Sequence, residues 1–164
     1  MNDRRLATLL AENLSPRVGR GSWHGGPTVV GALRGVSAPQ AHRRPAPGRH
    51  SIWELALHIA YWNHTITQRL RGGERIAFPR GASNWPAPPG RPDEAAWKRD
   101  RELIRATHLE IARTIRAVPP AAYGRRPAGT RKWTIGELIL GAAQHEAYHT
   151  GQIQLLKRLG GTRK

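Results

Sequence analysis

Apolar residues recur at three- and four-residue spacing along several segments of the chain, and this spacing predicts helices. The longest predicted helices cover residues 3–14, 51–71, 93–118 and 134–159, and a shorter helix is expected near 27–35. No segment shows the alternation of apolar and polar residues that is typical of strands. The pattern therefore predicts an all-α fold.

The ends of two predicted helices carry specific signals. Ser51 with Glu54, and Thr134 with Glu137, have the spacing of capping boxes, so a helix is expected to begin at each pair. Five prolines within 79–92 exclude a continuous helix across that connection. Four long helices with one long crossover, between the second and the third, are typical of a four-helix bundle. We expect residues 1–164 to form a single domain of this kind.

The composition limits the possible chemistry and location. Cysteine is absent, so disulfides, a thiolate metal site and a cysteine nucleophile are excluded, and a metal would need nitrogen or oxygen ligands. No apolar run reaches the length of a membrane span, and "MNDRRLATLLAENL" lacks the apolar region and cleavage site of a signal peptide. A cytoplasmic protein without a membrane association is therefore expected.

The net charge of +16 first suggests a nucleic-acid partner. However, the Lys and Arg residues are spread along the chain, with no run longer than two and no basic tail. A basic surface that attracts small anionic molecules explains the charge equally well. Direct nucleic-acid binding is therefore not the favoured interpretation.

Three histidines fall on the faces that the predicted helices should turn inward. The last helix has a heptad-spaced seam, which runs through Ile135, Leu138, Ala142, His145, His149, Gln152 and Leu156. In the second helix, His58 lies beside the apolar stripe of Leu55, Ile59, Trp62 and Ile66. A single histidine on an apolar face is more often a hydrogen-bonded core residue than a ligand. Two on one seam and a third on another helix instead favour a metal site, because catalytic zinc sites commonly use three protein ligands and keep one position open.

The segment "HEAYH" also matches the H-E-x-x-H signature of zinc peptidases. Such peptidases take their third ligand downstream of the motif, but the fifteen residues after His149 contain no His, Asp or Glu. The peptidase interpretation is therefore not favoured. Glu146 then has two interpretations, a catalytic general base or a surface or supporting carboxylate. His108, among the apolar residues of the third helix, could also reach the interior.

Several motifs taken together resemble the DinB-like superfamily of metal-binding four-helix bundles (DinB/YfiT-like), over residues 22–158. They are "SWHGGP", "HSIWELALHIAYW", "NWPAPP", "AAWKRD" and "HEAYHTGQI". The resemblance implies His58, His145 and His149 as the metal ligands, zinc or nickel as the ion, and a homodimer. It also implies relatives that use a low-molecular-weight thiol as cosubstrate.

The favoured hypothesis is a divalent-metal protein that acts on a small molecule as a metal-dependent hydrolase or a thiol-dependent transferase, with catalysis itself left open. Since the chain has no cysteine, a thiol would have to come from a cosubstrate. The main alternative is a non-catalytic helical bundle, related to stress or associated with nucleic acid. A third is a bundle whose histidines have only a structural role.

Overall fold

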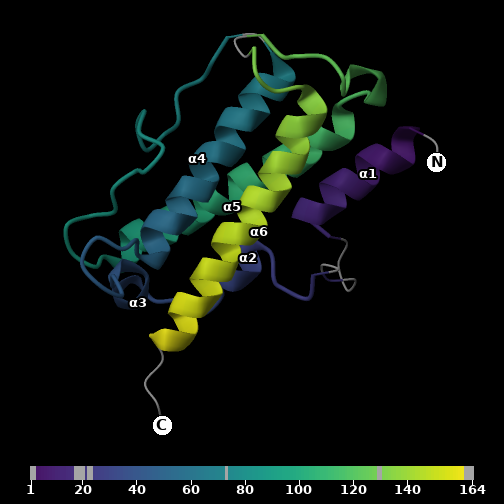
Figure 1. Cartoon of the computed structure of the whole chain (residues 1–164). Helices are drawn as coiled ribbons and strands as arrows, with labels where there is room; N and C mark the ends of the chain where they lie inside the picture. Colours follow the sequence, from purple (N-terminus) through teal and green to yellow (C-terminus); the bar gives the residue numbers. More distant parts are fainter. Residues whose placement is uncertain (1–2, 17–20, 22–23, 73, 129–130, 161–164) are drawn as a thin grey trace.

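The structure is a computed structural model that describes residues 3–16, 21, 24–72, 74–128 and 131–160, and within these residues it contains helices and no strand (Figure 1). The long helices are α1 (Asp3–Leu14), α4 (Ile52–Arg71), α5 (Glu94–Ala117) and α6 (Ile135–Leu159). The short ones are α2 (Val29–Ala32), α3 (Ala38–His42) and the 3₁₀ turn η1 (Pro120–Ala122). None of the helices in the described residues combines the length and the apolar character of a membrane span.

The long helices pack as an all-α bundle, which confirms the predicted fold class. Helix α4 lies against α5 and α6, and α1 packs against α5 and α6 near one end of the molecule (Figure 1). The long crossover connects α4 to α5 and runs along the outside of α4. Helix α2 contacts α5 and α6, and α3 contacts α4.

The predicted capping boxes are present at both helix starts. The Ser51 hydroxyl accepts a hydrogen bond from the Glu54 N–H at 3.2 Å, and the Glu54 carboxylate accepts one from the Ser51 N–H at 2.8 Å. Thr134 and Glu137 make the same pair of bonds at the start of α6. Each such cap stabilises a helix by about 1 kcal/mol. The predictions did not include α3, which Ser37 caps.

Two buried tryptophans fix the short helices and α5 against α4. The rings of Trp53 and Trp97 lie 4.9 Å apart and are almost fully buried. The Trp53 indole donates to the Asp100 carboxylate at 2.8 Å, and the Trp97 indole donates to the carbonyl of Val36 at 2.7 Å. Burying such large rings with their N–H groups satisfied stabilises this end of the bundle.

The bundle core consists of two apolar clusters separated by a polar layer. One cluster includes Ile59, Ile104 and Ile153, and the other includes residues of α1 together with the C-terminal parts of α4 and α5 and the start of α6. Between them, each of the three long central helices buries a polar residue. These residues are Asn63 on α4, His108 on α5 and Glu146 on α6. The candidate site lies beside this layer.

Candidate metal centre

His58, His145 and His149 converge although they come from two different helices. His58 lies in the second turn of α4, and the other two lie one turn apart on α6. One ring nitrogen from each histidine lies within 4.8 Å of the corresponding atoms of the other two. His58 is 5% exposed, His149 is 8% exposed and His145 is half-buried, so the group is enclosed on most sides.

Hydrogen bonds fix the orientation of two of these rings. The Nδ1–H of His58 donates to the backbone carbonyl of Asn84 at 2.5 Å, and the Nδ1–H of His149 donates to the side-chain oxygen of Gln152 at 2.7 Å. These acceptors have no proton to give, so in each neutral ring Nε2 carries the free lone pair. Metal-binding histidines are held in this way by a partner on the second nitrogen.

Aromatic rings of α4 and of the crossover enclose His58. The Trp85 ring stacks on the His58 ring with centroids 3.8 Å apart, and on the His50 ring with centroids 3.7 Å apart. Two imidazoles at that spacing cannot share one face of an indole, so Trp85 lies between the two histidines. Trp62 contacts His58 and His145 edge-on, at 6.4 and 6.2 Å between centroids. The rings shield this part of the site from water.

This environment keeps the three imidazoles neutral at physiological pH. Burial lowers the pKa of His58 to about 4, against the opposing effect of the Asn84 hydrogen bond. Burial, followed by the nearby rings of His149 and His58, lowers the pKa of His145 to about 4. The pKa of His149 is also lowered, mainly by burial. Neutral imidazole is the form that binds a metal ion.

The donor set fits a divalent transition metal. Nε2 of His58 lies 3.1 Å from Nε2 of His145. Two nitrogens bound to one zinc ion at the usual bond length and tetrahedral angle are about 3.3 Å apart. Three imidazoles are also a ligand type that suits zinc and nickel, whereas magnesium and calcium prefer oxygen.

A family model described as the DinB superfamily matches residues 25–153, from the loop before α2 to the last part of α6. The chain belongs to the DinB superfamily. The predicted resemblance is therefore confirmed. Comparison with curated proteins and with solved structures gave no match. Family membership and the converging histidines together fit a metal-binding protein of this superfamily.

Glu146 turns toward the interior of this DinB-superfamily bundle. The residue is 3% exposed, and its carboxylate lies 2.9 Å from Nδ1 of His108 and accepts a hydrogen bond from the Asn63 amide at 2.9 Å. The heptad seam of the sequence passes through His145 and places Glu146 beside it. In the structure the buried seam of α6 keeps the heptad spacing but runs one residue later at this position, through Ile139, Glu146 and Ile153, so Glu146 is buried and His145 is only half-buried. A catalytic role for Glu146 stays a prediction.

Sequence reasoning missed the residues that support the histidines. Asn84 and Trp85 come from the crossover, 26 residues or more beyond His58, and no local pattern shows which loop residue meets a helix. Gln152 is three residues after His149 on the same helix, and this spacing was a usable signal. His108 reaches the interior, as the sequence allowed.

Proposed function

We propose that this chain binds one divalent ion, zinc or nickel, through Nε2 of His58, His145 and His149, and that it is a metal-dependent enzyme acting on a small molecule. The observation that carries the proposal is the convergence of three neutral imidazoles within 4.8 Å. Two of them are oriented by carbonyl acceptors on the other ring nitrogen. Nε2 of His145 lies 3.1 Å from Nε2 of His58, a distance that suits either a hydrogen bond between the rings or two ligands of one ion, and the third imidazole within reach favours the ion.

Each part of the site has a definite task in this proposal. Asn84 and Gln152 hold their histidine rings in one tautomer and one orientation. Trp62 and Trp85 exclude water from one side, which strengthens electrostatic interactions within the site. A bound divalent ion with an open coordination position supplies Lewis acidity toward a substrate or cosubstrate atom.

Two reaction classes suit this arrangement, hydrolysis and thiol-dependent group transfer. In the second class the thiol must come from a cosubstrate, because the chain contains no cysteine. Nickel-loaded protein mixed with 2-mercaptoethanol tests whether a thiol can reach the ion, which the second class requires. Group transfer predicts a thiolate-to-nickel charge-transfer absorption that is lost in His145→Ala. Absence of the band in wild-type protein that has taken up nickel would exclude a bound thiol and leave hydrolysis.

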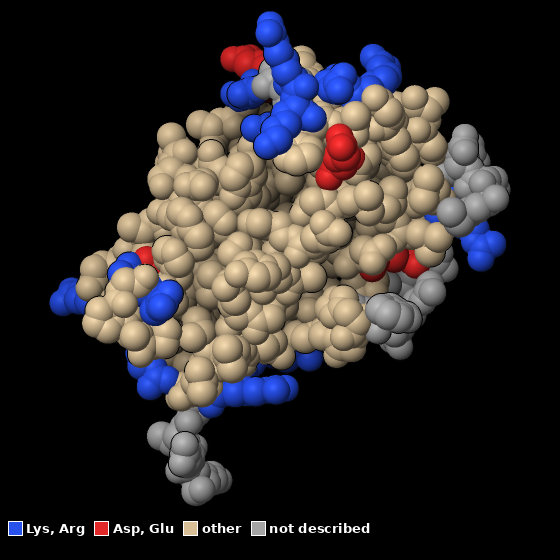
Figure 2. Space-filling view, in the orientation of Figure 1, with Lys and Arg blue, Asp and Glu red and all other residues tan. Residues whose placement is uncertain are grey.

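We further propose that the chain forms a homodimer through the outer face of α6. This face exposes large apolar side chains, which are Leu140, Tyr148, Leu155 and Leu159, each at least half exposed. The side of the molecule on which α6 lies shows a broad area without charged side chains, in a protein of net charge +16 (Figure 2). An uncharged apolar surface of this kind is typical of a contact between copies of one chain.

A further inference from the structure

A cavity of about 570 Å³ lies at the end of the bundle where α4 and α5 end and α6 begins. Arg69 on its wall is eleven residues beyond His58 on α4, about 16 Å along the helix axis. The cavity is therefore separate from the histidine site. Its lining combines arginines with apolar residues from α4, α5, η1 and the start of α6.

Backbone hydrogen bonds fix one wall of this cavity. The N–H of Ile135 donates to the carbonyl of Arg125 at 2.8 Å, and the N–H of Gly136 donates to the carbonyl of Tyr123 at 2.9 Å. A β-carbon at position 136 would lie 3.3 Å from that same Tyr123 oxygen, so glycine permits the close approach. The segment that carries Arg125 is thereby held against the first turn of α6.

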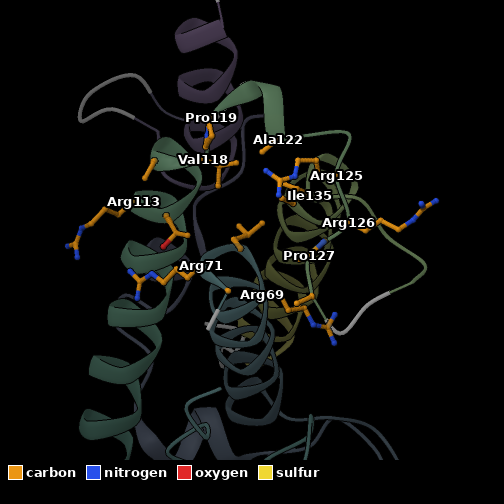
Figure 3. A pocket seen from close by; sticks show the side chains of 15 residues that line it. Arg69, Arg71, Arg113, Val118, Pro119, Ala122, Arg125, Arg126, Pro127 and Ile135 are labelled. Atoms are coloured by element: carbon orange, nitrogen blue, oxygen red, sulfur yellow. The ribbon is translucent and has the colours of Figure 1, made fainter. Parts of the chain in front are cut away.

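The cavity has an excess of positive charge. Five arginines line it, and Glu110 pairs with two of them, Arg71 and Arg113. Within the described part of the chain, no carboxylate pairs with Arg69 or Arg125. Figure 3 shows Arg125 turned inward beside Ile135, whereas Arg113 and Arg126 extend away from the cavity on opposite sides. Lys and Arg side chains also gather at this end of the molecule in Figure 2.

Two polar atoms on the cavity wall are buried without a hydrogen-bond partner. They are Nε of Arg69 and the hydroxyl oxygen of Thr114, a residue that is only 6% exposed. Unsatisfied buried polar groups are rare and destabilising, and a ligand can satisfy them.

The remaining lining is apolar, with Leu70, Val118, Ala122, Pro127 and Ile135 around the arginines. We propose that this cavity binds a small organic anion, with its charge attracted by the arginines of the lining and an apolar body against the other residues. The volume is in the range of small-molecule sites. Arginine binds carboxylates and phosphates in the same bidentate manner, so the two are separated by experiment.

The test uses the fluorescence of 1-anilinonaphthalene-8-sulfonate, an apolar probe with one anionic group, titrated with the full-length protein. The double variant Arg69→Ala/Arg125→Ala should bind the probe at least tenfold more weakly, because the cavity loses the two lining arginines that no described carboxylate pairs with. Arg99→Ala removes the same charge from the exposed face of α5, about 21 Å along the axis from Arg113, and should bind like wild type. Equal affinity in all three proteins would overturn the proposal.

Competition identifies the chemistry of the ligand. Octanoate or octyl phosphate should displace the probe, and whichever does so at the lower concentration shows whether the site prefers a carboxylate or a phosphate. Octanol and inorganic phosphate, which each lack one half of the ligand, should be at least tenfold weaker. Displacement by octanol as effective as by octanoate would contradict the role of the arginines.

The single variant Arg125→Ala, in an exposed loop, repeats the test should the double variant be unfolded. Zinc binding should be unchanged in the double variant and in Arg125→Ala. A failure of the anion proposal is therefore distinguishable from a failure of the metal proposal.

Discussion

Glu146 lies 2.9 Å from the ring of His108, and the contact joins α6 to α5 across the interior of the bundle. Both residues are 3% exposed, and Asn63 of α4 completes the cluster through the same carboxylate. Glu146 follows His145 directly in the chain. The contact therefore sets the rotation of α6 about its axis, and with it the direction in which His145 and His149 project.

Replacing Glu146 with alanine should destabilise the protein by about 1–3 kcal/mol, because it leaves the buried polar groups of His108 and Asn63 without their acceptor. Urea unfolding of the two proteins measures this difference. The exposed Glu102→Ala substitution on α5 removes one carboxylate and should change the free energy of unfolding by less than about 0.5 kcal/mol. A Glu146→Ala protein as stable as Glu102→Ala would show that the buried cluster contributes nothing to stability.

Gln152 should contribute to metal affinity without binding the metal. Its side-chain oxygen accepts the Nδ1–H of His149, so Gln152→Leu leaves that ring without a fixed orientation. Loss of such a supporting contact lowers metal affinity by about 10–100-fold. Gln154→Leu, a half-buried glutamine two residues along the same helix, is the matched control. Competition with a zinc-sensitive dye gives both dissociation constants, and equal values would contradict this role.

The stability of the metal-free protein should fall as the pH decreases from about 6.5 toward 4. Burial lowers the pKa of His58 and of His145 to about 4, whereas an imidazole in an unfolded chain titrates near 6.5. Above this window both rings are neutral in both states. Within it the unfolded chain binds protons that the folded chain does not, so the free energy of unfolding decreases with decreasing pH.

Urea unfolding between pH 4.5 and 7.5 measures this dependence, and His145→Asn should flatten it because one titrating group is removed. His64→Asn, which removes a histidine outside the site, controls for the substitution. Parallel loss of stability in wild type and His145→Asn would contradict a contribution of His145 to this pH dependence.

The fold was predictable from local signals, whereas the site was only partly so. Ser51 and Thr134 mark the starts of two helices through contacts with residues three positions away, so the sequence alone located them. His58, His145 and His149 were found because helical spacing places them on inner faces. Asn84 and Trp85 could not be found, because the path of a proline-rich crossover depends on contacts with α4 that no short-range pattern contains.

The exposed apolar face of α6 predicts self-association. Wild-type protein should sediment at twice the 18.2 kDa mass of one chain, and Tyr148→Glu/Leu155→Glu should sediment as a single chain, because two charges would be buried in the contact. Sedimentation equilibrium measures both masses. Arg99→Ala, away from this face, should keep the wild-type mass. A monomeric wild-type protein at micromolar concentration would contradict the proposed homodimer.

The most direct test of the central claim is the metal stoichiometry of protein produced without an affinity tag, stripped with a chelator and dialysed against zinc or nickel. Wild type and His64→Ala should each retain one ion per chain, whereas His58→Ala, His145→Ala and His149→Ala should retain much less than one. Retention of one ion per chain by all three site variants, or of none by the wild type, would contradict the proposed metal centre.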